Sequence, residues 1–195
     1  MSTRLKQEFR KIYYARRREI SATARHQAAL TAMEYFLQYD IFKQSQAIAC
    51  YMPFRDELDV TPLISKIWRE NKQCYLPVLT DGKVLSFVCY EEGDKLVANR
   101  YSILEPQNTF RRIQASHLDM VVIPLVVFDI YGHRLGTGGG YYDRTFAFLR
   151  HQTNKKPLLA GVGYALQQAE LVPTDPWDVN LQVVVTENKL LYCET

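Results

Sequence analysis

A glycine-dense segment at residues 134–144, RLGTGGGYYDR, carries the groups of this sequence that are best suited to binding an anion. Four of its residues are glycines, at positions 136, 138, 139 and 140. Because glycine lacks a Cβ atom, the backbone can turn tightly and bring its N–H groups close to a ligand. An apolar run from Met120 precedes the segment and predicts a buried strand, and residues 141–151 after it predict a helix. A strand, a glycine loop and a helix in this order predict a phosphate site.

Two charged side chains flank the glycines and fit the same interpretation. Arg134 carries a planar fork of N–H donors that matches phosphate oxygens. Asp143 places a carboxylate where a phosphate-bound Mg²⁺ could sit. A plain flexible turn is the simpler alternative, but four glycines between Arg134 and Asp143 favour phosphate binding.

The loop differs from both common phosphate-binding motifs. A Walker A loop needs a Gly-Lys-Ser/Thr ending, which the sequence lacks. The dinucleotide fingerprint G-x-G-x-x-G fails because Tyr141 stands where its third glycine should be, and Leu166 fails the same test after Gly161 and Gly163. The chemistry therefore predicts a phosphate loop of another type.

A basic first helix is the second feature that could bind phosphate. Apolar residues at helical spacing predict a helix over residues 3–18. Lys6 and Arg10 are four residues apart, so they share one face and could hold one polyphosphate together. Charge alone favours a solvated basic face instead, and we interpret Lys11 and the three arginines at 16–18 in that way.

The composition is that of an ordinary globular domain, with 195 residues of which 47% are hydrophobic and 23% charged. We therefore expect one domain over residues 1–195. The net charge of +3 does not require nucleic acid, and the sequence contains no apolar run of membrane-spanning length. The four cysteines have no metal-ligand spacing, which predicts buried, reduced thiols in a cytoplasmic protein.

Alternating strand and helix patterns predict the fold class. We expect helices over residues 3–18, 21–38 and 61–71, and strands over 47–52, 74–78, 84–90, 119–129, 158–164, 183–186 and 189–192. The turn at Asp81-Gly82 makes a small hairpin of two of these strands. Segment 93–99 is expected to be a loop or a short helical segment, and segment 107–117 is expected to be polar surface. The prediction is a single-domain α/β fold with an open, mainly parallel sheet flanked by helices on both faces in three layers.

The segment RLGTGGGYYDR resembles the glycine-loop signature of the 5-formyltetrahydrofolate cyclo-ligases, also called 5,10-methenyltetrahydrofolate synthetases. That signature runs R-L-G-x-G-x-G-Y-Y-D. The resemblance implies an ATP- and Mg²⁺-dependent enzyme that converts 5-formyltetrahydrofolate to 5,10-methenyltetrahydrofolate, ADP and phosphate. ATP would phosphorylate the formyl oxygen, and N10 of the folate would then close the ring.

The resemblance also implies roles for individual residues, with Arg134 and Glu57 in catalysis. Glu57 follows the strand 47–52 and would contact the folate, although the threonine after it, Thr61, is displaced by one position. Tyr101 would stack on the nucleotide base, or is simply a half-buried tyrosine. The implied ATP-binding residues are Lys6, Arg10, Arg134, Leu135, Gly136, Thr137, Gly138, Gly139, Gly140, Tyr141 and Tyr142. The implied folate-binding residues are Met52, Glu57, Thr137, Gly138, Gly139, Gly140 and Tyr141, and the implied Mg²⁺ ligands are Asp143 and Asp178.

One further departure from the family pattern and two alternative functions accompany this interpretation. Some family members carry basic residues where this loop has Thr137 and Gly139, which shifts charge neutralisation toward Lys6, Arg10 and the backbone. Another ATP-dependent kinase or ligase could use the same loop. A nucleic-acid-binding module could use the basic helix and the 13 tyrosines, but no recognition motif is present. We expect a monomer or at most a weak dimer, without nucleic-acid or membrane partners.

Overall fold

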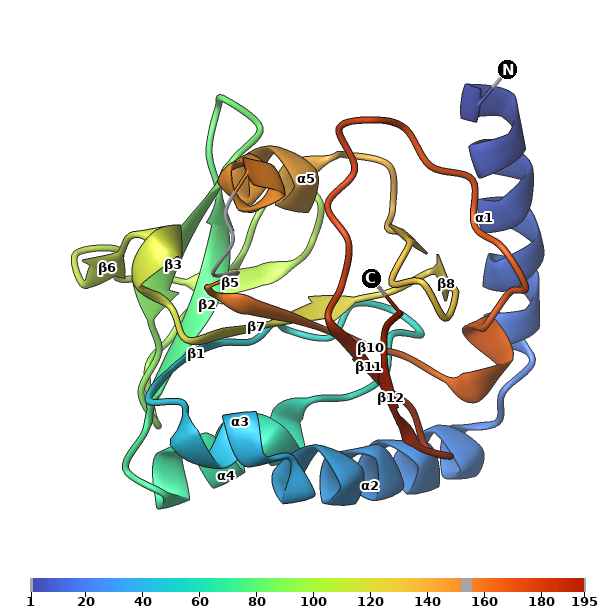
Figure 1. The fold of residues 1–195 in the computed structure, drawn as a ribbon. Helices are drawn as coiled ribbons and strands as arrows, with labels where there is room; N and C mark the ends of the chain where they lie inside the picture. The colour runs from blue at the N-terminus through green and yellow to red at the C-terminus, as the bar shows by residue number, and fades with distance from the viewer. Residues whose placement is uncertain (1, 152–155, 195) are drawn as a thin grey trace.

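The computed structural model describes residues 2–151 and 156–194, and an eight-stranded sheet runs through its middle (Figure 1). In spatial order its strands are β12 (Leu190–Tyr192), β11 (Val183–Val185), β10 (Leu158–Val162), β7 (Met120–Pro124), β1 (Ala47–Ala49), β2 (Gln73–Leu79), β3 (Leu85–Cys89) and β6 (Arg112–Ile113). The five strands from β11 to β2 are parallel, and β12 and β3 are antiparallel to their neighbours. The predicted mainly parallel sheet is confirmed, as is the hairpin of β2 and β3.

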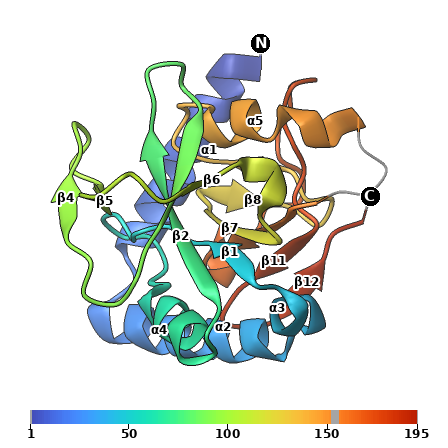
Figure 2. The same cartoon turned by 90° about the vertical axis from the view of Figure 1, so that its left-hand side faces the viewer.

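Helices cover the two faces of the sheet unequally. α2 (Ala22–Gln38), α3 (Asp40–Gln44) and α4 (Thr61–Arg69) lie on one face (Figures 1 and 2). The other face carries the short α5 (Tyr141–Thr145) and the 3-10 helix η2 (Ala147–His151). α1 (Ser2–Arg18) stands at one end of the molecule, where it contacts β8 (Val127–Phe128) and the 3-10 helix η3 (Ala165–Gln167).

Alternation along the strands builds a separate core on each face. In β7, Val122 packs in the core with Phe36 of α2, whereas Val121 packs on the opposite face with Phe146. All four side chains are at most 1% exposed. Burial of a large apolar side chain contributes about 2 kcal/mol, so these two cores are what hold the helices against the sheet.

The predicted strand 119–129 is wrong in its second half. β7 ends at Pro124, and the chain then leaves the sheet to form a small hairpin of β8 with β9 (Arg134–Leu135). The buried Asp129 side chain accepts the backbone N–H groups of Tyr131 and His133, at 3.0 Å each, and so fixes the hairpin turn. The proline and this Asx-type turn, rather than the apolar pattern, decide where the strand stops.

Two further local predictions need correction. The helix predicted over 141–151 is α5 followed by a 3-10 turn, because the Thr145 hydroxyl bonds back to the Tyr141 carbonyl at 2.7 Å and accepts Leu85 N–H at 2.8 Å. Segment 93–99 contains β4 (Leu96–Ala98), which pairs with β5 (Leu104–Pro106). Segment 107–117 contains no buried residue, which confirms the predicted surface location, and it contributes β6 and the 3-10 helix η1 (Ala115–His117).

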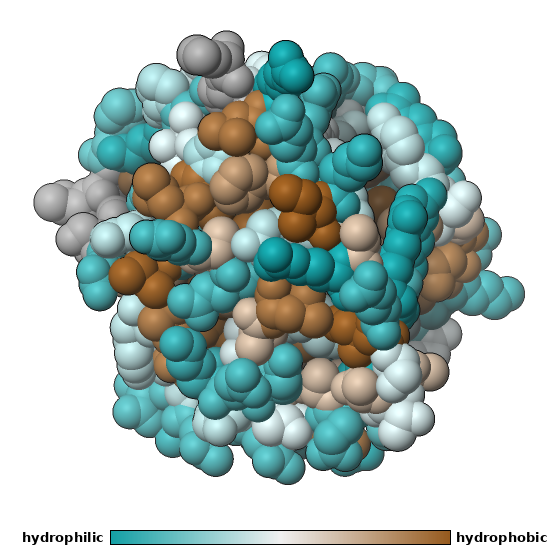
Figure 3. Space-filling model, turned by 90° about the vertical axis from the view of Figure 1, so that its right-hand side faces the viewer, coloured by the Kyte–Doolittle hydropathy of each residue, from teal (hydrophilic) through white to brown (hydrophobic). Residues whose placement is uncertain are grey.

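The outer surface on the α1 side is mixed in character. On the face shown in Figure 3, hydrophobic residues form separate patches that hydrophilic side chains divide. This arrangement differs from the broad, continuous apolar surface that obligate oligomers bury.

Candidate active site

A cavity of about 690 Å³ opens at the carboxyl ends of the parallel strands. The chain runs from β1 to β2 on one side and later places β7 on the other side of β1, so the strand order reverses there. Open α/β sheets form their ligand crevices at such a reversal. Tyr51 and Met52 after β1, and Ile123 and Pro124 of β7, line the cavity.

The structure brings every residue of the predicted site to this one cavity. The lining residues include Lys6 and Arg10 of α1, Met52 and Glu57 of the loop after β1, all of segment 134–143, and Asp178. Segments from the beginning, middle and end of the chain therefore meet at one place. Their roles stay predictions, whereas their proximity is a property of the fold.

The glycine loop depends on conformations that other residues rarely adopt. Gly138 and Gly140 have φ angles of +101° and +66°, and Gly140 is the N-cap of α5. A Cβ atom on Gly138 would lie 3.4 Å from Cζ of Arg10, so the loop packs directly against that guanidinium. Arg10 also donates from Nε to the Gly136 carbonyl at 2.8 Å. α1 thus holds the loop in its turn.

The phosphate end of the cavity contains cations that are paired with carboxylates. Lys6 Nζ lies 2.6 Å from Asp178 Oδ2 and 2.8 Å from Asp175 Oδ2. Arg134 is 9% exposed and binds Asp143 Oδ1 through Nη2 at 2.9 Å. Burial by itself would lower the pKa of Lys6, but the two carboxylates more than offset this and raise it. Lys6 therefore stays charged.

The carboxylates fit a metal that is shared with a phosphate. Asp143 uses Oδ1 for both Arg134 and the Val179 N–H, and Asp178 uses Oδ2 for both Lys6 and the Asp175 N–H. Within residues 2–151 and 156–194, no three His, Cys, Asp or Glu side chains are grouped to hold a metal alone. Mg²⁺ commonly takes one or two carboxylates and completes its shell with phosphate oxygens and water. Asp143 and Asp178 suit that kind of ligand set.

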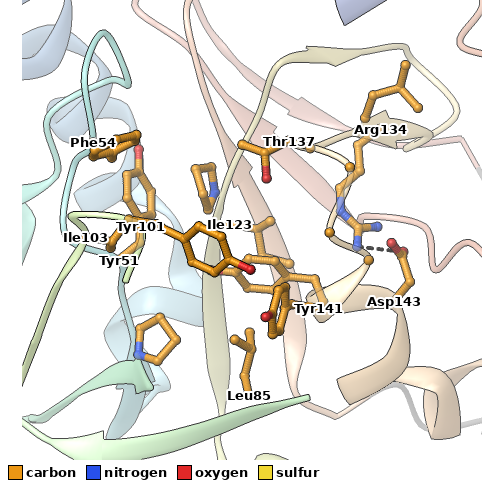
Figure 4. Close-up of a pocket in the computed structure, with 18 of the residues that line it drawn as sticks. Tyr51, Phe54, Leu85, Tyr101, Ile103, Ile123, Arg134, Thr137, Tyr141 and Asp143 are labelled. Carbon is orange, nitrogen blue, oxygen red and sulfur yellow. Dashed lines mark hydrogen bonds and ion pairs between the residues drawn. The ribbon is translucent and has the colours of Figure 1, made fainter. Parts of the chain in front are cut away.

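The opposite side of the cavity is aromatic and apolar. Figure 4 shows Tyr51, Phe54, Tyr101 and Ile103 on one side and the Arg134–Asp143 pair on the other. Tyr101 is 50% exposed, and the Arg100 guanidinium lies 5.1 Å from the centre of its ring. Arg100 also donates to the Tyr141 hydroxyl at 3.4 Å, and this hydrogen bond lowers the pKa of Tyr141. These flat rings suit a planar ligand.

Glu57 is a half-buried acid at the aromatic end. Its Oε2 accepts the backbone N–H of Phe54 at 3.0 Å. Burial raises its pKa to about 7, against the opposing effects of that N–H and of Arg17. At neutral pH the group is therefore close to its midpoint, which is unusual for a loop carboxylate.

Arg17 is the residue that sequence reasoning placed wrongly. It was assigned to a solvated face, but it is 4% exposed and lines the cavity. A signal was present, because Arg17 lies seven positions after Arg10 and eleven after Lys6, on the same helix face. Asp175, which the sequence analysis did not single out, also contacts Lys6.

A mainly parallel sheet that opens onto one cavity, with a glycine loop and cations facing an aromatic wall, defines an α/β protein built around a small-molecule site. Comparison of the sequence narrows this class of proteins to one family, because the profile of the 5-formyltetrahydrofolate cyclo-ligase family matches residues 2–187 of the chain. The chain belongs to this family, whose named members are ligases.

Individual relatives agree with this placement. The 5-formyltetrahydrofolate cyclo-ligase of Escherichia coli K12 is 38% identical over 90% of this chain and 96% of its own length. The enzyme of the same name from Haemophilus influenzae is 36% identical over 93% and 97%. The solved Aquifex aeolicus 5,10-methenyltetrahydrofolate synthetase superposes with a TM-score of 0.83 at 31% identity, covering 98% of this chain and 94% of that one.

Among the described residues, no helix is both long and apolar enough to cross a lipid bilayer.

Proposed function

We propose that this protein converts 5-formyltetrahydrofolate to 5,10-methenyltetrahydrofolate at the expense of ATP, with Mg²⁺. The observation that carries the proposal is that one cavity joins a cationic glycine loop to an aromatic end with a half-buried acid. A reaction between a nucleoside triphosphate and a flat folate needs the phosphate end and the aromatic end of the cavity within one site. The family of the chain supports the same substrate pair.

The phosphate end would align and neutralise the transferring phosphoryl group. Lys6, Arg10 and Arg134 would contact phosphate oxygens, and the backbone N–H groups of the glycine loop would add donors. Asp143 and Asp178 would hold Mg²⁺, which when bound supplies positive charge between the phosphates. Phosphoryl transfer is catalysed mainly by positioning and by electrostatic stabilisation, so these groups are the ones on which turnover depends.

Two bond exchanges complete the reaction. The formyl oxygen attacks the γ-phosphorus, a new P–O bond forms, and the bond to the ADP oxygen breaks. N10 of the folate then attacks the formyl carbon and loses its proton, and the C–O bond to phosphate breaks. The product carries an N5–CH–N10 bridge, and ADP and phosphate leave.

The aromatic end would hold the folate head. Glu57 offers carboxylate oxygens to the N–H groups of the pterin, and Met52 provides an apolar contact. Tyr141 and Tyr142 line the cavity between the two ends, where folate and ATP would meet. Desolvation of the half-buried Tyr142 raises its pKa, so its hydroxyl stays protonated as a donor.

An absorbance assay tests this proposal directly. Methenyltetrahydrofolate absorbs in the near ultraviolet and the formyl substrate does not, so we expect the signal to grow only when ATP and Mg²⁺ are both present. If the absorbance did not change with 5-formyltetrahydrofolate, ATP and Mg²⁺ all present, that result would contradict the proposed reaction.

Two substitutions test the phosphate end. Arg134→Ala and Asp143→Asn should each lower turnover by at least roughly a hundredfold, the scale of losing one preorganised charge-stabilising group. Arg18→Ala and Asp40→Asn remove the same charges from exposed positions and should leave turnover unchanged. Near-normal turnover in both site variants would refute the roles given to these residues.

The location and the partners that the sequence predicts are also part of the proposal. All four cysteines are free thiols, which supports a cytoplasmic location. On the one face that Figure 3 shows, the divided apolar patches are consistent with the expected monomer or weak dimer. Three cations of α1, Lys6, Arg10 and Arg17, face the cavity and not the outer surface, which argues against use of this helix for nucleic acid.

A further inference from the structure

The loop that carries Glu57 is a compact turn that is closed on itself. The Glu57 side chain accepts the Phe54 N–H through Oε2 at 3.0 Å, and the Glu57 N–H donates to the Phe54 carbonyl at 3.2 Å. Between these residues, Arg55 adopts a φ of +54°, in the left-handed region. These bonds keep the shape of residues 54–57, but they do not fix where the turn lies relative to the cavity. That depends on contacts with other elements.

Contacts of this kind hold the residues on both sides of Glu57. On one side, the Tyr51 hydroxyl donates to the carbonyl of the buried Leu58 at 2.6 Å. On the other side, Arg25 Nη1 donates to Asp56 Oδ1 at 2.6 Å. The first contact ties the turn to the chain just after β1, and the second ties it to α2. Glu57 therefore lies between two anchors that come from different elements.

The Arg25 guanidinium is itself held in place by the corner between α1 and α2. Arg25 lies in the first turn of α2, and its Nε donates to the Ile20 carbonyl at 2.9 Å. Its Nη2 lies 3.4 Å from the carbonyl of Arg18, in the last turn of α1. The last carbonyls of a helix lack an intrahelical partner, so they are ready acceptors for an arginine. The corner thereby directs Nη1 toward Asp56.

Stability alone gives the ion pair of Arg25 and Asp56 little purpose. The two side chains are 26% and 23% exposed, and ion pairs that water reaches contribute little to the free energy of folding. Their geometry is nevertheless specific, because 2.6 Å is short for a hydrogen bond between a guanidinium and a carboxylate. The pair therefore fixes a position more than it adds stability.

We propose that Arg25 is a positioning residue for the folate: through its ion pair with Asp56 it holds the turn 54–57 so that the Glu57 carboxylate stays where the pterin would bind. This inference rests on the proposed function, in which Glu57 accepts hydrogen bonds from the pterin. The described residues that line the cavity include Glu57 but neither Arg25 nor Asp56, so the pair would act through the turn and not by touching the ligand. Hydrogen bonds weaken steeply when their direction is lost, so a displaced turn would bind folate less tightly.

A double-mutant cycle tests this inference, with 5-formyltetrahydrofolate binding measured by titration calorimetry in the presence of a non-hydrolysable ATP analogue. At pH 8 Glu57 is mostly ionised. Arg25→Met should raise the dissociation constant about tenfold, less than the roughly hundredfold effect of a misplacement of about 1 Å, because the second anchor remains. In a Glu57→Ala background, which lacks the group to be positioned, the same substitution should change the constant by less than about twofold.

Two further variants separate the ion pair from other effects. Asp56→Ala breaks the pair from the loop side and should weaken folate binding as Arg25→Met does. Because it leaves the bonds of Arg25 to the end of α1 intact, it replaces Arg25→Met in the cycle if circular dichroism shows that variant to be unfolded. Lys43→Met is the matched control, because it breaks the exposed ion pair with Asp40 on α3 and should leave folate binding unchanged.

The cycle distinguishes positioning from a general structural effect. A purely structural role of Arg25 would weaken folate binding equally with and without the Glu57 carboxylate, and that result, or unchanged binding in Arg25→Met, overturns the inference. Binding that Glu57→Ala does not weaken would overturn the role of Glu57, and the inference with it. Wild-type protein that binds no folate would overturn the proposed function as well.

Discussion

Glu57 and Arg17 are charged groups held where water is scarce, and each is costly to keep there. Burial raises the pKa of Glu57 from its ordinary value of 4.5 to about 7. The native protein therefore holds a proton that the unfolded chain releases between these pH values. A group of this kind favours folding at low pH, and its contribution is lost as pH rises through the interval. At neutral pH and above, the ionised Glu57 carboxylate therefore lowers the stability of the fold. In the proposed function the same carboxylate binds the folate.

Glu57→Gln should separate these two effects. At pH 8 the variant should be more stable than the wild type, by up to about 3 kcal/mol, because it no longer buries an ionised group. Near pH 4.5 the difference should vanish, while folate turnover is lowered at neutral pH. Urea unfolding at both pH values measures this. Glu92→Gln, at an exposed position, is the control, and a pH-independent change in the Glu57 variant would contradict the argument.

The sequence could single out Glu57 as a site residue, but it could not predict the environment that raises the pKa of this side chain. The loop after β1 carries three acids, Asp56, Glu57 and Asp59, and they look alike in a linear sequence. Asp56 is paired with Arg25, and Asp59 accepts the N–H of Thr61 at 2.8 Å. Glu57 instead lines the cavity together with Tyr14 and Arg17 of α1 and Tyr142 of α5, which lie far away in the chain. Burial of this type depends on tertiary packing.

Among the elements, the glycine loop was predicted well and its neighbours less so. The backbone conformation of the loop depends on local chemistry, because glycines are needed at the positions where φ is positive. The strand before it was predicted too long, since an apolar run continues past Pro124 although the sheet does not. In α1 the face bearing Lys6 and Arg10 was recognised, but its continuation to Arg17 was not. Periodicity has to be followed to the end of a helix.

Gly138→Ala should show what the loop conformation contributes. At φ +101° an alanine is strained, and its Cβ would lie 3.4 Å from Arg10, so we expect a loss of about 1–3 kcal/mol in stability and weaker ATP binding. Gly136→Ala is the matched control, because its Cβ would meet nothing within 4 Å and its φ is not positive. Thermal unfolding and nucleotide titration compare the two. Equal stabilities would show that the loop does not need its left-handed turn.

At the scale of the whole molecule, a segment near the beginning of the chain and one near its end meet at the phosphate side of the cavity. Lys6 of α1 is bound to Asp175 and Asp178, about 170 positions later, and Arg134 is bound to Asp143. The fold class was predictable from alternating strands and helices, whereas this meeting followed only from the family resemblance, because no local pattern reveals the spatial strand order. In the free protein the groups proposed for phosphate and those proposed for Mg²⁺ therefore neutralise one another. Nucleotide and metal should replace these pairs together.

Lys6→Met should consequently have opposite effects on the two ligands. Without the ammonium group, Asp178 loses a cation at 2.6 Å, and Mn²⁺ alone should bind about tenfold more tightly, equivalent to about 1.4 kcal/mol. ATP should bind more weakly, because a phosphate contact is gone. Electron paramagnetic resonance of free Mn²⁺ and equilibrium dialysis of ATP measure these separately. Lys11→Met, which changes an exposed lysine of the same helix, should alter neither. If Lys6→Met weakened Mn²⁺ binding as well, Lys6 would not be the counter-ion that competes with the metal.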